Sequence, residues 1–121
     1  MKCENLDVWK KSAALSAEIY RELAESKDFG FKDQLTRAGL SIPSNIAEGM
    51  ERISDQEKIR FLDIARSSTA EAATQIYIGM KIEYIGIPKG KEWIETLDHI
   101  AKMLSSLIGS IQNKQKDRIE K

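Results

Sequence analysis

Few side chains in this 121-residue sequence are of a type and spacing that could carry out catalysis. His99 is the only histidine and Cys3 the only cysteine, so paired imidazole or thiol ligands for a metal are missing. Serines such as Ser41 and Ser68 have no histidine or lysine placed by the sequence to activate them as nucleophiles. The sequence contains no glycine-rich phosphate-binding loop. We therefore expect a protein that is not an enzyme and uses no metal or cofactor.

Basic and polar side chains form a second pattern, which favours binding or packing over catalysis. The whole chain is balanced, with 19 basic and 19 acidic residues, so it lacks the bulk attraction of a typical nucleic-acid binder. Basic residues lead only mildly from Pro88 to Lys121. Two interpretations stay open: contact with phosphate, or a hydrogen-bonded network that fixes the packing of helices and subunits. The candidate phosphate ligands are Arg37, Arg52, Arg60, Arg66, Lys114 and Lys116, and the candidate network comprises Ser41, Asn45, Glu48, Glu71 and Gln75.

The elements that must position these side chains are helices. Hydrophobic residues recur at three- and four-residue steps through four segments that are joined by short connections. Four such segments predict an all-α fold, an antiparallel up-down four-helix bundle, formed as a single domain. The segments span residues 5–27, 31–50, 55–85 and 91–116, the domain covers 1–121, and a polar, fraying tail is expected from about residue 113.

Pro43 lies in the middle of the second segment, where it removes a backbone N–H and clashes with the carbonyl of Gly39. The hydrophobic face keeps its phase across the proline. We therefore predict one continuous helix with a kink at Pro43. The alternative is that one helix ends here and another begins with Pro43 in its first turn.

The third segment is expected to form a long helix. Ser54 and Glu57 have the spacing of a capping box at its start, and no strong helix breaker follows before Gly86 and Pro88. The helix would be about 45 Å long at the usual rise per residue. Residues 76–87 alternate in polarity and are rich in β-branched side chains, so alone they could form a strand. Because no other segment resembles a strand with which to pair, a helix is favoured.

The first two segments carry more apolar surface than one bundle core needs, which predicts self-association. In the first segment we expect a main buried face and a thinner second stripe nearly opposite. In the second segment, Leu40 and Ala47 add further apolar surface. The expected main face of the first segment comprises Leu6, Trp9, Ala13, Ala17, Tyr20 and Ala24, and the second stripe comprises Val8, Leu15 and Ile19.

The expected cellular compartment is inferred from three features that the sequence lacks. No apolar run is long enough to cross a bilayer, and the N-terminus has no apolar signal-peptide core. A lone cysteine allows no intramolecular disulfide. We expect a cytoplasmic protein that does not contact membranes.

Three stretches carry a resemblance to a known family: LDVW at residues 6–9, QLTRAGLSIPSNIAEG at 34–49 and RFLDIARSSTAEAATQI at 60–76. Their order and spacing resemble the small proteins encoded by intervening sequences in bacterial 23S rRNA genes. The resemblance covers most of the chain. One departure is Ser67, where relatives usually carry glycine, and this bears on how closely the third helix approaches its neighbour.

The resemblance implies a four-helix bundle that assembles into a homopentameric ring. A similar protein, the accessory variability protein of diversity-generating retroelements, binds nucleic acid and a reverse transcriptase. We therefore expect a non-enzymatic oligomer that binds RNA or DNA through a surface of the assembled ring. The alternative is a scaffold that holds a partner protein without touching nucleic acid.

Overall fold

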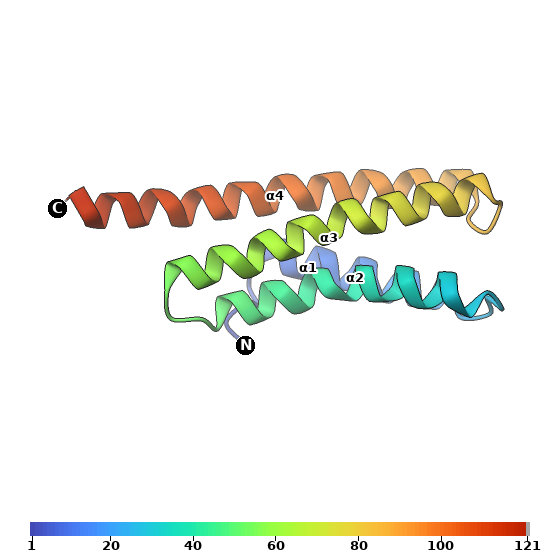
Figure 1. Cartoon of the computed structure of the whole chain (residues 1–121), viewed down its shortest axis with the longest axis horizontal. Coiled ribbons are helices and arrows are strands. Elements are labelled where there is room, and N and C mark those ends of the chain that lie inside the picture. The colour runs from blue at the N-terminus through green and yellow to red at the C-terminus, as the bar shows by residue number, and fades with distance from the viewer. Residues whose placement is uncertain (121) are drawn as a thin grey trace.

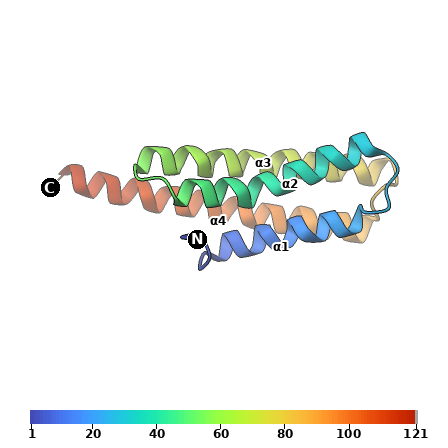
Figure 2. The ribbon, with the colours of Figure 1, turned by 90° about the horizontal axis from the view of Figure 1, so that it is seen from below.

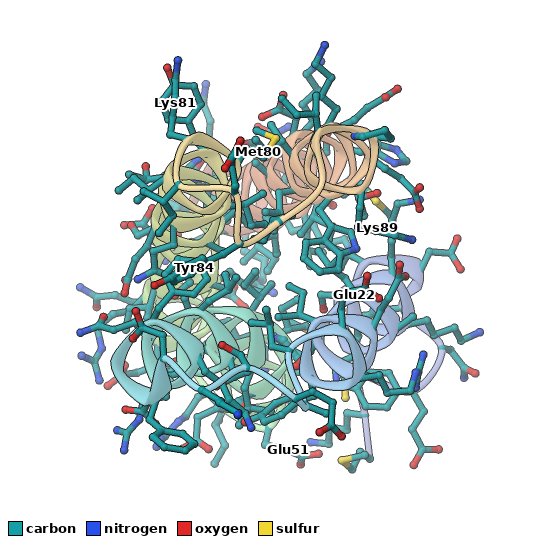
Figure 3. All side chains as sticks on the ribbon, turned by 90° about the vertical axis from the view of Figure 1, so that its right-hand side faces the viewer. Glu22, Glu51, Met80, Lys81, Tyr84 and Lys89 are labelled. Atoms are coloured by element: carbon teal, nitrogen blue, oxygen red, sulfur yellow. The ribbon has the colours of Figure 1, made fainter. Side chains whose placement is uncertain are left out.

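Four antiparallel helices make up the computed structural model, which describes residues 1–120 and the side chains of residues 1–119 (Figure 1). The last residue of the predicted domain, Lys121, lies outside the described residues. α1 packs against α2 and α4, and α3 packs against the same two helices. Seen end-on, the four helices occupy the corners of a square (Figure 3). The predicted all-α four-helix bundle is confirmed. The helices are α1 (Asp7–Glu22), α2 (Phe29–Met50), α3 (Asp55–Lys81) and α4 (Ile87–Glu120).

One hydrophobic core runs between the four helices. Trp93 is its largest fully buried side chain and has only 1% of its surface exposed. Each fully buried aliphatic side chain contributes roughly 1.5–3 kcal/mol relative to an exposed one. The core holds the helices as a rigid frame, so the surfaces between neighbouring helices have fixed shapes. Every helix supplies buried residues to it: Leu15 and Ile19 from α1, Leu35, Ile42 and Ile46 from α2, Leu62, Ala65, Ala72 and Ile76 from α3, and Trp93, Leu97, Ile100 and Leu104 from α4.

The buried face of α1 is the reverse of the predicted one. Val8, Leu15 and Ile19 are buried, whereas the stripe expected to be the main face is exposed at Ala17, Tyr20 and Ala24 and only partly buried at Leu6, Trp9 and Ala13. The prediction was wrong because both stripes repeat at helical spacing, and spacing alone does not choose between them. Close packing against α2 decides the choice: a Cβ placed on Gly39 would lie 3.4 Å from Ile19 Cδ1 and 4.0 Å from Ser16 Cα.

α2 runs from Phe29 to Met50 without a break, which confirms the continuous helix predicted across Pro43. The kink itself stays a prediction. Asp28 caps the start of the helix by accepting a hydrogen bond from the Phe31 amide at 3.1 Å. Beyond the proline, Asn45 Nδ2 donates to the Ser41 carbonyl at 2.8 Å, so a side chain reinforces the turn there.

α3 is helical from Asp55 and ends at Lys81, earlier than the predicted residue 85. Ser54 Oγ accepts from the Glu57 amide at 3.1 Å, which is the predicted N-terminal cap. After Lys81 the chain turns through Glu83, whose φ of 64° is in the left-handed region. The strand alternative for residues 76–87 is excluded, because residues 76–81 are helical and 82–86 form a turn.

α4 is the longest helix, with 34 residues against 27 in α3. It begins at Ile87 rather than at the predicted residue 91, with Pro88 in its first turn, where a missing N–H costs nothing. The polar stretch from about residue 113, expected to fray, continues as helix through Glu120. Figures 1 and 2 show this end extending beyond the other three helices.

Candidate interaction surfaces

A groove of about 690 Å³ runs between the N-terminal half of α3 and the C-terminal half of α4. In the square arrangement it lies on the edge of the bundle opposite the α1–α2 edge. Charged and amide side chains form its walls, and two isoleucines contribute apolar surface. We call it the polar groove. Its lining residues are Gln56, Glu57, Ile59, Arg60, Asp63, Arg66, Ile108 and Gln112.

Polar contacts between α3 and α4 bridge the polar groove at both ends. At one end, Arg66 donates to Ser105 Oγ on α4 at 3.1 Å and to Asp63 Oδ1 at 2.5 Å. At the other end, Arg118 of α4 forms an ion pair with Asp55 at the start of α3. Both arginines therefore connect α3 with α4 as well as carrying charge.

The arginines of the polar groove have carboxylate partners. Arg60 Nε donates to Glu57 Oε2 at 2.9 Å, and Asp63 pairs with Arg66. A guanidinium has five N–H donors, so these bonds leave donors for a ligand. The neighbouring carboxylates nevertheless weaken the positive field that a phosphate would experience.

Arg52 lies next to the polar groove through a shared aromatic contact. Its guanidinium carbon is 4.6 Å from the centre of the Phe61 ring, and that of Arg60 is 4.9 Å from the same centre. Arg52 also donates to Glu48 Oε1 at 2.6 Å. Two cations therefore share one aromatic ring at the α2–α3 turn, an arrangement stabilised by cation–π attraction.

The remaining candidate phosphate ligands lie in two other places. Arg37 is on the exposed side of α2, paired with Asp33 at 3.0 Å, and does not line the polar groove. Lys114 and Lys116 are exposed on α4, in the turns after Gln112. The structure thus brings Arg60 and Arg66 together, places Arg52 and the two lysines nearby in the fold, and leaves Arg37 apart.

The predicted polar network is divided between three places. Ser41 Oγ lies 2.9 Å from Ser68 Oγ, and Asn45 Nδ2 donates to Ser41 Oγ at 2.9 Å, so these three residues form one hydrogen-bonded seam between α2 and α3. Gln75 Nε2 donates to Gln34 Oε1 at 3.4 Å farther along the same helices. The other two members lie at the surface: Glu48 pairs with Arg52, and Glu71 is exposed on α3.

A second groove, of about 420 Å³, lies between α1 and α2. Tyr20 and Leu40 are 42% and 45% exposed there, although both are large hydrophobic residues. The sequence predicted excess apolar surface at Leu40 and Ala47, and the outward stripe of α1 adds to it. We call this the apolar groove. Its lining residues are Trp9, Ala13, Ser16, Ala17 and Tyr20 of α1, and Leu40, Pro43, Ser44 and Ala47 of α2.

Sequence reasoning did not find the contact that connects α1 to α4. Glu18 Oε1 accepts from Lys89 Nζ at 2.9 Å and from Trp93 Nε1 at 3.1 Å. These bonds lower the pKa of the Glu18 carboxyl, and the Glu18 carboxylate raises the pKa of Lys89. Figure 3 shows Lys89 beside α1. With Glu18 held against α4, the Trp9–Tyr20 side of α1 faces outward.

The structure gives no indication of a metal centre or a membrane-spanning element in the part of the chain that it describes. Among these residues, no three His, Cys, Asp or Glu side chains lie close enough together to hold a metal ion. None of the described helices is long and apolar enough to span a bilayer.

The comparisons with known proteins agree with this fold. A crystal structure of a protein of unknown function from the S23 ribosomal protein family of Bacteroides thetaiotaomicron is similar, with a TM-score of 0.78 and 30% sequence identity over 84% of this chain and 97% of that chain. No curated protein matches the chain. Residues 4–106 match the 23S rRNA-intervening sequence proteins and include Arg60 and Arg66 but not Lys114 or Lys116. The chain therefore belongs to the 23S rRNA-intervening sequence protein family.

Proposed function

We propose that this protein is a non-enzymatic, self-associating helical bundle that binds nucleic acid, RNA or DNA, through the polar groove and the adjacent turns of α4. The observation that carries the proposal is the position of Arg60 and Arg66 in one groove with two amides. The similar crystal structure is described as a protein of unknown function, and neither comparison names an enzymatic activity.

Local charge supports this choice of surface. The sequence from residue 109 to 121 contains four basic residues and two acidic ones, a net charge of +2, whereas residues 1–108 carry a net charge of −2. Because the arginines of the polar groove keep carboxylate partners, we expect moderate affinity in one copy of the chain. Repetition of the surface in an assembly would increase the apparent affinity without any new contact.

Self-association is proposed to use the apolar groove. Exposed Tyr20 and Leu40 lie beside Trp9 and small residues on one continuous surface. Apolar surface of this kind is stabilised when a partner removes it from water, at about 25 cal/mol per Å². The family resemblance implies that the assembly is a homopentamer.

The test is light scattering of the purified protein, alone and with a structured RNA, at low and at high salt. The proposal predicts an oligomer whose mass increases with RNA at low salt and returns to its starting value at high salt, because phosphate contacts release counterions. An oligomer that ignores RNA at low salt would refute nucleic-acid binding, and a monomer would refute self-association.

The apolar groove also supports a second candidate function, a scaffold that holds a partner protein. In that case a helix or extended segment of the partner would fill the groove, with little dependence on salt. Retention of an identified partner at high salt, and its loss when a charge is placed in the groove at Ala17, would favour the scaffold. A partner released by salt would contradict it.

A further inference from the structure

The two amides of the polar groove belong to different helices. Gln56 comes from the first turn of α3 and Gln112 from α4, and both side chains line the groove. Neither amide hydrogen-bonds to the part of the protein that the structure describes. Each therefore offers a carbonyl acceptor and an NH₂ donor to whatever enters the groove.

Apolar surface lies between these polar groups. Ile59 is partly buried, and Ile108 keeps only 6% of its surface exposed, so both sit below the rim. A flat ligand can cover the isoleucines with its face while its edge reaches the amides. Water bound over this apolar surface is displaced favourably by such a ligand.

The carboxylates of the polar groove extend its set of acceptors. Glu57 bonds Arg60 through Oε2, and Asp63 bonds Arg66 through Oδ1. The second oxygen of each carboxylate remains an acceptor. Acceptors beside amide donors complement the edge of a nucleobase, which combines amino groups with ring nitrogens and carbonyl oxygens. A bare phosphate offers only acceptors, so it would leave the carboxylate oxygens and amide carbonyls of the groove without donors.

The contacts that the polar groove offers favour an unpaired base. A base that covers the isoleucines with its face and reaches the amides with its edge must have both face and edge free. A base inside a duplex has its faces stacked and its pairing edge bonded to the complement, so it cannot make both contacts. Sequence-tolerant and sequence-specific readers of single strands alike take up bases that are unstacked from their neighbours.

We propose that the polar groove binds an unpaired base of single-stranded nucleic acid. Gln56 and Gln112 bond the edge of the base, Ile59 and Ile108 contact its face, and Arg60 with Arg66 contacts the phosphates on either side. This inference rests on the proposed function and specifies the form of nucleic acid that is bound.

The test is fluorescence anisotropy at low salt with a short labelled strand of mixed adenine and cytosine, prepared as RNA, as DNA, and as RNA annealed to its complement. At least one single strand should bind about tenfold more tightly than the duplex. The double variant Gln56→Ala/Gln112→Ala should lose this preference by weakening single-strand binding about tenfold, as expected for two lost hydrogen bonds. The control is Asn113→Ala, an exposed amide next to Gln112 that does not line the groove.

The outcomes separate this inference from the proposed function. Equal binding of duplex and single strands, or unchanged binding by the double variant, would overturn the base site while salt-sensitive nucleic-acid binding stands. No binding of any probe at low salt would overturn both. A stronger response with RNA than with DNA, or the reverse, together with sensitivity to Gln56→Ala/Gln112→Ala, would support the site and identify its strand chemistry.

Discussion

The polar groove and the apolar groove are built on the same plan and differ in chemistry. Each lies between two antiparallel helices, and they occupy opposite edges of one square bundle. The apolar groove is lined by rings, alanines and a proline, whereas the polar groove is lined by amides and ion pairs. Backbone arrangement alone therefore does not decide what such a surface binds.

The difference indicates what kind of contact each edge favours. Apolar surface gains stability whenever a partner excludes water from it, which suits a lasting contact between protein chains. Burying charged groups costs desolvation that only good pairing offsets, which suits a polar ligand that exchanges with solvent and salt. The following predictions test this division, from the largest expected effect to the smallest.

Placing a charge in the apolar groove should have the largest effect. Ala17→Glu would bury an unpaired carboxylate in the proposed contact between chains, weakening association by about 100-fold or more. Sedimentation equilibrium over a range of concentrations measures this loss. Ala14→Glu, exposed on the same helix and outside the groove, is the control and should associate normally. An unchanged mass for Ala17→Glu would show that the apolar groove is not the contact.

Removing charge from the polar groove should weaken RNA binding and leave association intact. Arg60→Gln/Arg66→Gln should reduce affinity at low salt about tenfold and lower the slope of log affinity against log salt by about two, one for each lost phosphate contact. Arg37→Gln removes an arginine that also has a carboxylate partner but lies outside the groove, and should change both values less. If both variants lost the same affinity for RNA, binding would depend on the total charge of the protein and not on the position of the arginines in the polar groove.

Removing the N-terminal cap of α3 should destabilise the bundle modestly and leave the residues that line the two grooves in place. Ser54→Ala deletes the acceptor for the Glu57 amide and should lower the free energy of unfolding by about 1 kcal/mol. Urea denaturation measures the change. Ser106→Ala, an exposed serine of α4, should stay within about 0.5 kcal/mol of the parent. A Ser54→Ala protein as stable as the parent would show that the cap contributes nothing.

Acid should loosen the α1 side of the bundle through Glu18. The pKa of Glu18 is lowered in the folded state, so its contribution to stability is present above its ordinary pKa of 4.5 and is lost as pH falls through the folded value. Glu18→Gln should therefore flatten part of the decline in unfolding free energy below about pH 4.5. Glu25→Gln, on an exposed carboxylate, is the control. Identical pH profiles for Glu18→Gln and the parent would contradict this assignment.

Lys89, the basic partner of Glu18, makes stability depend on pH in the opposite direction. The pKa of Lys89 is raised by Glu18, so its contribution is present below its ordinary pKa of 10.5 and is lost as pH rises through the folded value. The ion pair therefore contributes to the α1–α4 contact in the range between acid and strong alkali.

The helices could be predicted from sequence because each carries its own local signals. Ser54 caps α3 as predicted, whereas Pro88, predicted to be a helix breaker, lies in the first turn of α4, a common position for proline. Fraying of the tail beyond residue 113 stays a prediction, and this stretch is helical through Glu120, as the good helix propensity of its lysine, glutamine and arginine residues favours. The ion pair of Arg118 with Asp55 adds a tertiary contact that no local pattern reveals.

The surfaces were harder to predict because they depend on pairing between distant residues. Arg66 and Ser105 are 39 positions apart in the chain, and only the antiparallel packing of α3 and α4 brings them together. Arg60, Arg66 and Arg37 were all predicted as phosphate ligands, because no local sequence pattern shows which arginines lie in the same groove. The sequence pattern also placed Tyr20 on the main buried face of α1 and Ile19 on the second stripe, because the constraint that buries Ile19 is the close approach of Gly39 on another helix.

The extension of α4 beyond its neighbours has a consequence for hydrogen exchange. Near Lys114, the backbone amides are held by helical bonds with little packed core around them, so they should exchange with deuterium much faster than those near Leu104. The polar groove ends beside this fast-exchanging stretch, at Gln112. A ligand that reaches from the groove onto these turns would slow their deuterium uptake while the rest of the bundle keeps its rates. Deuterium uptake at the C-terminal turns of α4 would then measure whether the polar groove is occupied, without a label on the protein or the ligand.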